Sequence, residues 1–310
     1  MLKKTAFLFP GQGSQYVGMG QDIADAFPSA KKIFEQVDEI CGFAISKLCF
    51  EGPMDELTLT VNLQPAVSAV NLACLAAVAE SGISPDMTAG HSLGEYSALV
   101  CAGVITVEDA LRLVNKRGEL MHREAMANPG AMAAIIGMDI NKVNHVVEMA
   151  KDDDILAVAN HNSSEQIVIS GEKKPVSRAM KIAKEKRARA VPLKVSGAWH
   201  CQLIDGAVSE FRDFIKTVSF RQPELPVIFN VTANSETDPE RIQDIMARQL
   251  VSPVKWYDII IRMIQDGVNV FVEVGPKKVL SGLLKKIIPQ DQDIRVLNVG
   301  TLEELRTLTI

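Results

Sequence analysis

The sequence is poor in aromatic residues and cysteines, and it lacks long uncharged apolar runs. Aromatic residues make up 5% of the 310 residues, and the five cysteines are odd in number without any C-x-x-C spacing. Such cysteines encode neither a disulfide framework nor a zinc site, and they fit a reducing cytoplasm. The most apolar stretch, residues 65–79, falls short of the roughly 18 residues needed to cross a bilayer. We therefore expect a soluble, cytoplasmic protein without a bound metal, a cofactor or a membrane partner.

The remaining composition is that of an ordinary globular protein. Hydrophobic residues make up 47% and charged residues 23%, and the net charge is -5. This charge is unevenly distributed, because residues 170–196 hold nine Lys or Arg and two Glu. The basic segment suggests an acidic protein partner or a phosphorylated ligand, and a solvated basic helix face is the plain alternative. We expect no nucleic acid partner.

Short apolar runs alternate with helical patterns in the first 127 residues and again after residue 198. The runs at residues 5–10, 86–92, 225–231 and 268–276 are typical of buried strands, and residues 23–41, 65–80 and 106–125 are typical of helices. The run at residues 5–10 is too short for a secretory signal and is interpreted as the first strand. Alternation of this kind predicts an α/β fold, a parallel sheet with helices on its faces.

Residues 128–197 follow a different pattern. Strands are predicted at 130–138, 155–160, 165–171 and 189–195, with helices at 140–150 and 174–186. The order β-α-β-β-α-β is the signature of a ferredoxin-like unit. Because the α/β pattern resumes afterwards, we expect an inserted ferredoxin-like small domain at 128–197, within a large domain formed by residues 1–127 and 198–310.

A serine lies between two glycines where a predicted strand meets a helix. The sequence GHSLG places Gly90 and Gly94 two positions either side of Ser92. This G-x-S-x-G spacing is typical of a nucleophile elbow, a sharp turn that lifts the serine hydroxyl above the end of a sheet. Ser92 is therefore the candidate nucleophile.

A serine hydroxyl needs a base to take its proton, and His200 is the best of the five histidines. It follows a predicted strand, lies in a loop and precedes a helix, so it can reach the end of the sheet. His161, in a predicted loop, remains possible. The other three are poorer candidates: His91, which adjoins Ser92, and the two in charged helices, His122 and His145. Cys201 could be a nucleophile, but a buried structural cysteine is the favoured interpretation.

Acyl transfer also needs N–H donors for the developing oxyanion. The elbow supplies the backbone N–H of Leu93, and a second donor should come from a neighbouring loop. The loop FPGQGSQ at residues 9–15 fits, because its glycines permit close approach and Gln12 carries an amide. A phosphate-binding loop is the alternative, although the Walker lysine is missing.

The helix at 106–125 places an arginine beside its apolar stripe. Thr106 with Asp109 resembles a capping box, and helical spacing puts Arg117 at the rim of the apolar face rather than in solvent. A guanidinium in that position needs a carboxylate, either from the protein or from a ligand. A structural salt bridge is the plain alternative.

Several motifs in this order make the chain resemble the malonyl-CoA:acyl carrier protein transacylases. The resemblance covers about residues 5–290 and is carried by FPGQGSQ, LQPA, GHSLGEYSALVCAG, VNKRGELM, GAMAAIIG, QIVISG, WHCQL, RQLVSPVKW and EVGP. It implies an α/β-hydrolase-like large domain with a ferredoxin-like insert. It also implies malonyl transfer from malonyl-CoA to the phosphopantetheine thiol of an acyl carrier protein, in fatty acid biosynthesis or in a polyketide pathway.

The resemblance also assigns roles to individual residues. It implies that Ser92 carries the malonyl group and that His200 is the general acid and base, oriented by the backbone carbonyl of Gln249. The remaining implied roles are the oxyanion donors, Gln12 and the Leu93 amide, and the residue that binds the malonyl carboxylate, Arg117.

Substrate selectivity follows from two of these positions. A carboxylated acyl group satisfies the Arg117 guanidinium, whereas an acetyl group leaves it unpaired. Trp199 would crowd a branch at C2, which favours malonyl over methylmalonyl, with core packing as the plain alternative. Leu63 and Lys277 depart from residues common in the family without touching the predicted chemistry.

Two other functions use the same features. A serine thioesterase or esterase would need Ser92 and His200 but no arginine beside the acyl group. A docking subunit that retains the fold without activity would need none of the four residues Ser92, His200, Gln12 and Arg117.

Overall fold

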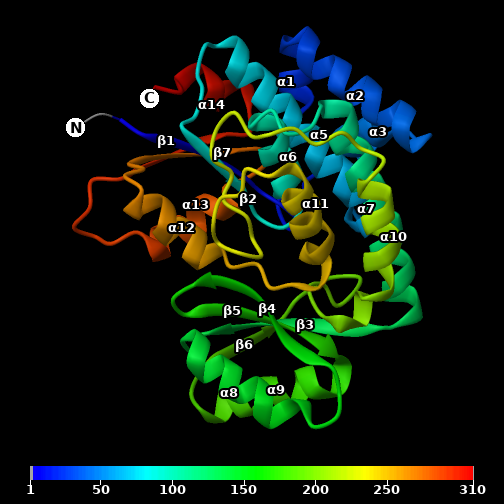
Figure 1. The fold of residues 1–310 in the computed structure, drawn as a ribbon, viewed down its shortest axis with the longest axis vertical. Coiled ribbons are helices and arrows are strands. Elements are labelled where there is room, and N and C mark those ends of the chain that lie inside the picture. Colours follow the sequence, from blue (N-terminus) through cyan, green and yellow to red (C-terminus); the bar gives the residue numbers. More distant parts are fainter. Residues whose placement is uncertain (1–2, 310) are drawn as a thin grey trace.

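The computed structural model describes residues 3–309, which form a large part and a small part (Figure 1). The elements up to Ala127 and from Gln202 onward build the large part, drawn in blue through teal and in yellow-green through red. The middle of the chain, drawn in green, builds the small part below it. The expected fold, an α/β-hydrolase-like part with an inserted ferredoxin-like part, is confirmed.

The large part is organised around a parallel four-stranded sheet in the order β2-β1-β7-β8. Its strands are β1 (Thr5–Phe9), β2 (Met87–Gly90), β7 (Val270–Val274) and β8 (Arg295–Val299). Both faces of β1 are buried: Phe7 and Phe9 pack into one core, and Ala6 and Leu8 into another. Burial on both faces explains the continuous apolar runs from which β1, β2 and β7 were predicted. β8, which is only partly buried, was not predicted.

Helices cover both faces of this sheet. One face packs on α12 (Trp256–Gln265) and α13 (Val279–Ile287). The rest of this part consists of further α-helices and two short 3-10 helices, labelled η. They are α1 (Gln21–Ala26), α2 (Pro28–Cys41), α3 (Ile45–Glu51), α4 (Met54–Thr58), α5 (Thr60–Glu80), α6 (Gly94–Cys101), α7 (Val107–Ala127), η1 (Gln202–Ile204), α10 (Gly206–Ile215), α11 (Pro239–Arg248), η2 (Gln249–Val251) and α14 (Leu302–Thr307).

Two predicted helices have different bounds in the structure. The helix predicted at 23–41 is two helices, because Phe27 is extended and Pro28 begins a new helix. The helix predicted at 65–80 begins earlier, at Thr60, with Pro65 inside it.

The central helix α5 corrects the expectation that no segment is long enough to cross a bilayer. It has 21 residues, and its most apolar window has a mean hydropathy of 1.5. Most of that window, 78%, is buried inside the protein. Its apolar side chains are therefore accounted for by core packing against α2 and α7.

The small part has the predicted β-α-β-β-α-β order. β3 (Gly130–Ile136), α8 (Ile140–Lys151), β4 (Leu156–Ser163), β5 (Gln166–Glu172), α9 (Lys173–Glu185) and β6 (Arg189–Pro192) follow one another. The sheet is antiparallel in the order β4-β5-β3-β6. One face packs on α8 and α9, and the other face contributes Met132, Ala134 and Val168 to the main core.

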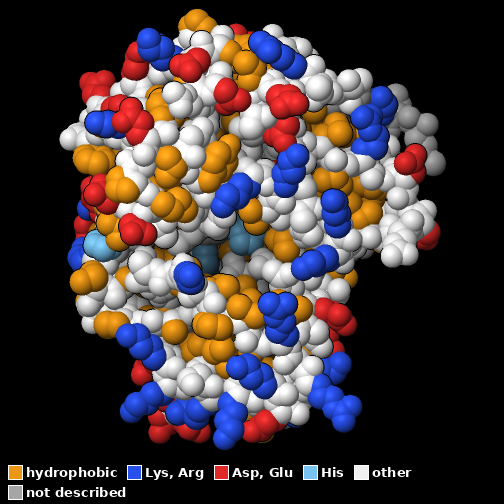
Figure 2. Space-filling model, turned by 180° about the vertical axis from the view of Figure 1, so that it is seen from behind, with side chains coloured by type: hydrophobic (Ala, Val, Ile, Leu, Met, Phe, Trp, Pro, Cys, Tyr) orange, Lys and Arg blue, Asp and Glu red, His pale blue; other side chains and the backbone are white. Residues whose placement is uncertain are grey.

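The basic segment lies on the small part. Figure 2 shows Lys and Arg side chains gathered over the lower end of the molecule. Arg178 is partly buried and forms an ion pair with Asp154 at 2.8 Å. The other basic residues of the segment are exposed: Lys173, Lys174, Lys181, Lys184, Lys186, Arg187, Arg189 and Lys194.

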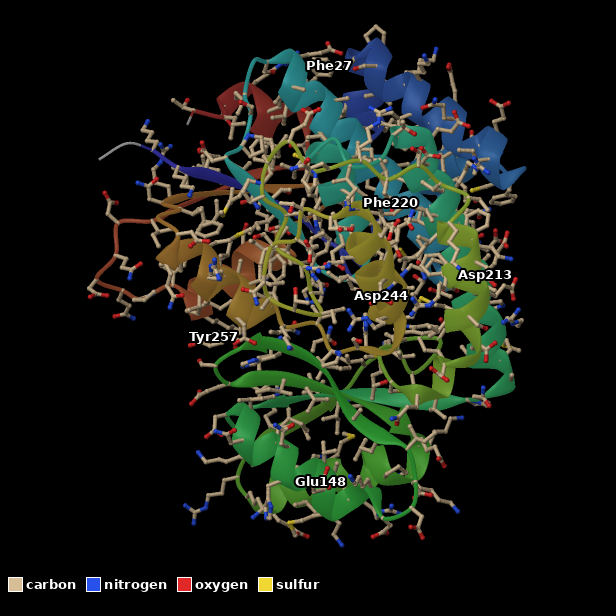
Figure 3. The ribbon with its side chains drawn as sticks, viewed as in Figure 1. Phe27, Glu148, Asp213, Phe220, Asp244 and Tyr257 are labelled. Carbon is tan, nitrogen blue, oxygen red and sulfur yellow. The ribbon has the colours of Figure 1, made fainter. Side chains whose placement is uncertain are left out.

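Strand β4 joins the two parts. The backbone N–H of His161 donates to the Val254 carbonyl at 2.9 Å, and the Val254 N–H donates to the Ala159 carbonyl at 2.8 Å. The His161 ring lies 4.9 Å from the ring of Tyr257, which Figure 3 places at the boundary between α12 and the small sheet. The expectation that His161 lies in a loop is therefore wrong, because it is a strand residue at this junction.

The prediction of a strand at residues 225–231 is also wrong, because these residues form no continuous strand. Val227 and Ile228 form only isolated bridges, with Thr88 and Ser235. After them the chain turns away from the sheet, because the backbone N–H of Asn230 donates to the Glu95 carboxylate instead of to a strand.

Candidate active site

The elbow lies between the end of β2 and the start of α6. Ser92 has a φ of 51°, in the left-handed region. A Cβ on Gly90 would lie 1.9 Å from the Gly94 carbonyl carbon, and a Cβ on Gly94 would lie 2.0 Å from the Phe9 carbonyl oxygen. Both positions therefore require glycine, and the turn presents the Ser92 hydroxyl at the carboxyl end of the sheet.

The structure brings together Ser92 and His200, which lie 108 positions apart in the sequence. The Ser92 Oγ lies 2.7 Å from Nε2 of His200. The other ring nitrogen, Nδ1, lies 3.0 Å from the backbone carbonyls of both Gln249 and Ser252. Because Nδ1 faces two acceptors, its proton is held there and Nε2 is left free to accept a proton from serine.

The surroundings of His200 keep the ring neutral. Burial, followed by the positive charge of Arg117, lowers the pKa of His200 from 6.5 to about 3. A neutral imidazole with an unprotonated Nε2 can accept the proton of the hydroxyl that it faces.

Arg117 lies inside the protein and points at the same hydroxyl. It is 2% exposed, and its Nη2 donates to the Ser92 Oγ at 3.2 Å and to Oε1 of Gln249 at 3.0 Å. Its Nη1 donates to Oε1 of Gln64 at 2.7 Å.

No carboxylate pairs with this guanidinium. Within residues 3–309, no acidic oxygen lies within 4.0 Å of Arg117, and its buried Nε has no hydrogen-bond partner. The alternative of a structural salt bridge is therefore wrong. A buried guanidinium with a free N–H group and no carboxylate in direct contact can bind an anionic group from outside the protein.

The loop at residues 9–15 lies against the elbow. A Cβ on Gly11 would lie 2.5 Å from the His91 carbonyl oxygen, so only glycine permits this approach. Asn71 Nδ2 donates to the Pro10 carbonyl at 2.9 Å, and the Ser14 hydroxyl donates to the Gly11 carbonyl at 2.7 Å. These bonds fix the loop that carries Gln12 beside the first turn of α6.

A small cavity of about 110 Å³ lies in front of the hydroxyl. It is smaller than the pockets of about 300–1,000 Å³ that hold drug-sized ligands, and it suits a short acyl group. Trp199, which is 4% exposed, forms part of its wall. The residues that line it come from both parts of the molecule: Gln12, Gln64, His91, Ser92, Leu93, Arg117, Met121, Met132, Asn160, Leu193, Val195, Trp199 and His200.

Four residues around the site, three of them buried and Ser252 partly buried, were not identified from the sequence. Gln64 contacts Arg117, Ser252 contacts His200, and Asn230 accepts a hydrogen bond from the Ser92 N–H at 2.6 Å. Glu95, which is fully buried, accepts hydrogen bonds from Asn230 and Gln249. The available signal was a polar residue within an apolar helical run, as Gln64 and Glu95 both are.

The other candidates from the sequence do not reach the hydroxyl. Cys201 is buried, and burial raises the pKa of its thiol, which is the environment of a structural cysteine. His91 lines the cavity, but its Nε2 is 2.8 Å from the Asn162 Oδ1. Within residues 3–309, no group of three or more His, Cys, Asp or Glu is arranged to hold a metal ion.

Comparison with known proteins identifies the family. The family model for the acyl transferase domain matches residues 6–304. The malonyl CoA-acyl carrier protein transacylase of Bacillus subtilis is 44% identical over 304 residues, which cover 97% of this chain and 96% of the relative. The malonyl CoA-acyl carrier protein transacylase of Haemophilus influenzae is 40% identical over 312 residues, which cover 100% of this chain and 100% of the relative.

Solved structures agree with these relatives. An acyl carrier protein S-malonyltransferase from Vibrio cholerae has a TM-score of 0.94 at 40% identity, covering 99% of this chain and 100% of the other. A malonyl-transacylase in complex with a type II PKS acyl-carrier protein has a TM-score of 0.94 at 38% identity, covering 98% of each chain. By its sequence and its fold, this chain belongs to the malonyl-CoA:acyl carrier protein transacylase family.

Proposed function

We propose that this protein transfers a malonyl group from malonyl-CoA to an acyl carrier protein in fatty acid biosynthesis, through a malonyl-serine intermediate. The observation that carries the proposal is the pairing of an unpartnered buried guanidinium with a nucleophile. Arg117 Nη2 lies 3.2 Å from the Ser92 Oγ, and no carboxylate oxygen of the described chain lies within 4.0 Å of the guanidinium. A carboxylated acyl group on the serine would supply the missing anion.

In the first half-reaction, His200 Nε2 takes the Ser92 proton while Oγ attacks the thioester carbonyl carbon. The Leu93 N–H and Gln12 donate hydrogen bonds to the oxyanion that forms, which lowers the barrier to its formation. When the carbon–sulfur bond breaks, the proton on His200 passes to the departing CoA thiolate. The products are malonyl-Ser92 and free CoA, with the imidazole again neutral.

In the second half-reaction, the phosphopantetheine thiol of the carrier protein enters the vacated position. His200 Nε2 takes the thiol proton, the thiolate attacks the ester carbonyl, and the same donors hold the oxyanion. The carbon–oxygen bond to Ser92 then breaks, and the proton returns from His200 to Oγ. The carbonyls of Gln249 and Ser252 hold Nδ1 throughout, so the ring keeps its tautomer.

Selectivity follows from the same geometry. Binding an uncharged acyl group would leave the Arg117 guanidinium buried without an anion, whereas malonyl supplies one. Trp199 lines the small cavity, and we propose that its indole excludes a methyl branch at C2.

We further propose that the enzyme works as a soluble cytoplasmic protein without a metal or an organic cofactor. Residues 1–127 and 198–310 would form its catalytic domain, and residues 128–197 its ferredoxin-like subdomain. Support for a soluble protein comes from the burial of α5, the apolar helix of the core.

Single-turnover acylation tests this function. Mixed with malonyl-CoA, the protein should release one equivalent of CoA and gain a malonyl adduct on Ser92, detected by mass spectrometry. Holo carrier protein should then collect the malonyl group, and Ser92→Ala should form no adduct. Rapid release of malonate to water without carrier protein would identify a hydrolase instead, and an unmodified serine would exclude both enzymes.

The pathway is tested with the carrier protein as the variable. We expect a higher kcat/KM with the fatty acid carrier protein of the same organism than with a polyketide carrier protein. The reverse preference would assign the chain to polyketide synthesis.

A further inference from the structure

Glu95 is a fully buried carboxyl group that the proposed mechanism leaves unused. It lies in the first turn of α6, three residues after Ser92, and is 0% exposed. Burial raises its pKa to about 7. Since a buried carboxyl is costly without hydrogen-bond partners, the identity of its partners indicates what it does.

Both of its oxygens accept hydrogen bonds from segments distant in the sequence. Oε1 accepts from the backbone N–H of Asn230 at 2.5 Å, and Oε2 accepts from Nε2 of Gln249. The Asn230 side chain in turn accepts from the Ser92 N–H and donates to the Gly90 carbonyl. Glu95 therefore links the elbow to the segments that carry Asn230 and Gln249.

The NH₂ group and the oxygen of the Gln249 side-chain amide contact different residues. Nε2 donates to Glu95 and, at 2.9 Å, to the Ser92 carbonyl, while Oε1 accepts from Arg117 Nη2 at 3.0 Å. Turning an amide by 180° hardly changes its shape, so its hydrogen-bond partners decide which end faces the arginine. Oε2 of Glu95 is the acceptor in this contact, and Glu95 therefore requires the NH₂ end of the amide.

We infer that Glu95 is a positioning residue for malonyl selectivity, which acts by fixing the Gln249 amide so that Arg117 stays directed at the Ser92 hydroxyl. The inference rests on the proposed function, in which Arg117 binds the malonyl carboxylate. With the amide turned, its NH₂ group would face the donor Nη2 of Arg117. Two donors in contact repel, and the guanidinium would leave its position.

A simple charge effect would have the opposite sign. Glu95 lies close enough to Arg117 to interact with its charge, so it also repels an anionic acyl group bound there. If charge alone mattered, removing the carboxylate would favour malonyl over acetyl. Positioning predicts that the same change favours acetyl.

The exchange Glu95→Gln separates the two effects at nearly constant shape. The backbone N–H of Asn230 still requires an acceptor, so the new NH₂ group would face Gln249 and turn its amide. We expect the ratio of kcat/KM for malonyl-CoA to that for acetyl-CoA to fall at least about tenfold. An unchanged or increased ratio would overturn the inference.

Glu273→Gln is the matched control. Glu273 is also a buried carboxyl with a raised pKa, but it accepts from the N–H groups of Leu280 and Ser281 at the start of α13. We expect this change to lower the free energy of unfolding and to leave the malonyl to acetyl ratio unaltered. A ratio that fell equally in both variants would count against a specific role for Glu95.

A double-mutant cycle tests whether Glu95 acts through Gln249. The change Gln249→Leu removes the side-chain amide and keeps the backbone carbonyl that faces His200. If the route is correct, Glu95→Gln lowers the ratio in the wild-type background and has almost no effect in the Gln249→Leu background. If the two changes instead lowered the ratio independently, so that their effects multiplied in the double variant, the inference would be overturned.

Two further observations keep the test decisive. Should Glu95→Gln not fold, Gln249→Leu alone removes the amide that Glu95 holds without adding a charge, and it too should lower the ratio about tenfold. An unchanged ratio in that variant would overturn the inference. Malonyl transfer by the wild-type enzyme is measured in parallel. Its absence would mean that the proposed function fails, whereas its presence with a normal variant ratio would mean that only this inference fails.

Discussion

Arg117 shows how one side chain can distinguish substrates that differ by a single carboxylate. Its guanidinium is buried, and its neighbours Gln64, Gln249 and Ser92 are neutral. A neutral oxygen satisfies the hydrogen bonds of a guanidinium but not its charge. An anion bound beside Ser92 should therefore be stabilised far more than an uncharged group of similar size.

We expect Arg117→Ala to lower kcat/KM for malonyl-CoA by at least about two orders of magnitude. Activity with acetyl-CoA should fall much less, so the relative preference shifts toward uncharged acyl groups. Steady-state kinetics with both substrates measure this. The control is Arg112→Ala, since Arg112 lies on the same helix with its side chain 42% exposed. Equal losses for both substrates would exclude the carboxylate role.

The protonation of His200 gives a second prediction at this scale. We expect its ring to stay neutral down to about pH 5, because its pKa is lowered to about 3. Arg117→Ala removes one cause of that lowering and should raise the pKa, while burial, the larger cause, remains. NMR titration of the labelled imidazole measures both values. A wild-type titration midpoint near 6.5 would contradict this account.

The same shift has a consequence for stability. In the unfolded chain a histidine binds a proton below its ordinary pKa of 6.5, whereas folded His200 does not until about pH 3. The unfolded state therefore binds more protons between these values, and this group destabilises the fold as pH falls through that window.

At the scale of elements, the elbow depends on two close backbone approaches. A Cβ at Gly94 would lie 2.0 Å from the Phe9 carbonyl oxygen, and neither backbone can move without displacing β1 or α6. The strain at Ser92 is thus maintained by the strand and the helix on either side of it.

We expect Gly94→Ala to lower the free energy of unfolding by about 1–3 kcal/mol and to abolish acylation, because the backbone must shift. Gly282→Ala is the control. Gly282 lies inside α13 with no atom within 4 Å of its added Cβ, so alanine should stabilise the protein by about 0.5–1 kcal/mol through helix propensity. Urea denaturation measures both. An unaffected Gly94→Ala enzyme would show that the elbow tolerates a side chain.

At the scale of the whole molecule, the small part closes the site and carries most of the basic segment. Lys194 lies between Leu193 and Val195, which both line the cavity, and it is exposed. A cation at this rim is well placed to meet an acidic carrier protein that delivers a thiol to the cavity.

We expect Lys194→Glu to raise the KM for the carrier protein several-fold and to leave Ser92 acylation by malonyl-CoA nearly unchanged. The effect should weaken with added salt, because exposed charges are screened. The control is Lys31→Glu, an exposed lysine on α2, at the far end of the molecule (Figure 1). Equal effects of the two variants would exclude a docking role for this rim.

Much of the fold could be predicted because its signals are local. The spacing of Gly90, Ser92 and Gly94 specifies a turn through short-range steric contacts, and the β-α-β-β-α-β order of the small part follows from hydrophobic periodicity. The capping of α7 by Thr106 was predicted on the same basis and is present. β8 was missed because its residues are only partly buried and its apolar pattern is weak.

The site required the tertiary structure because its contacts join residues far apart in the chain. The sequence by itself determined a strained serine, a loop able to approach it and an arginine beside an apolar stripe. Only the folded chain decided that Arg117 forms no ion pair with a carboxylate and that Glu95 is hydrogen-bonded to Gln249, 154 positions away. Such pairings depend on how whole strands and helices pack, and local spacing carries no information about which distant side chains will meet.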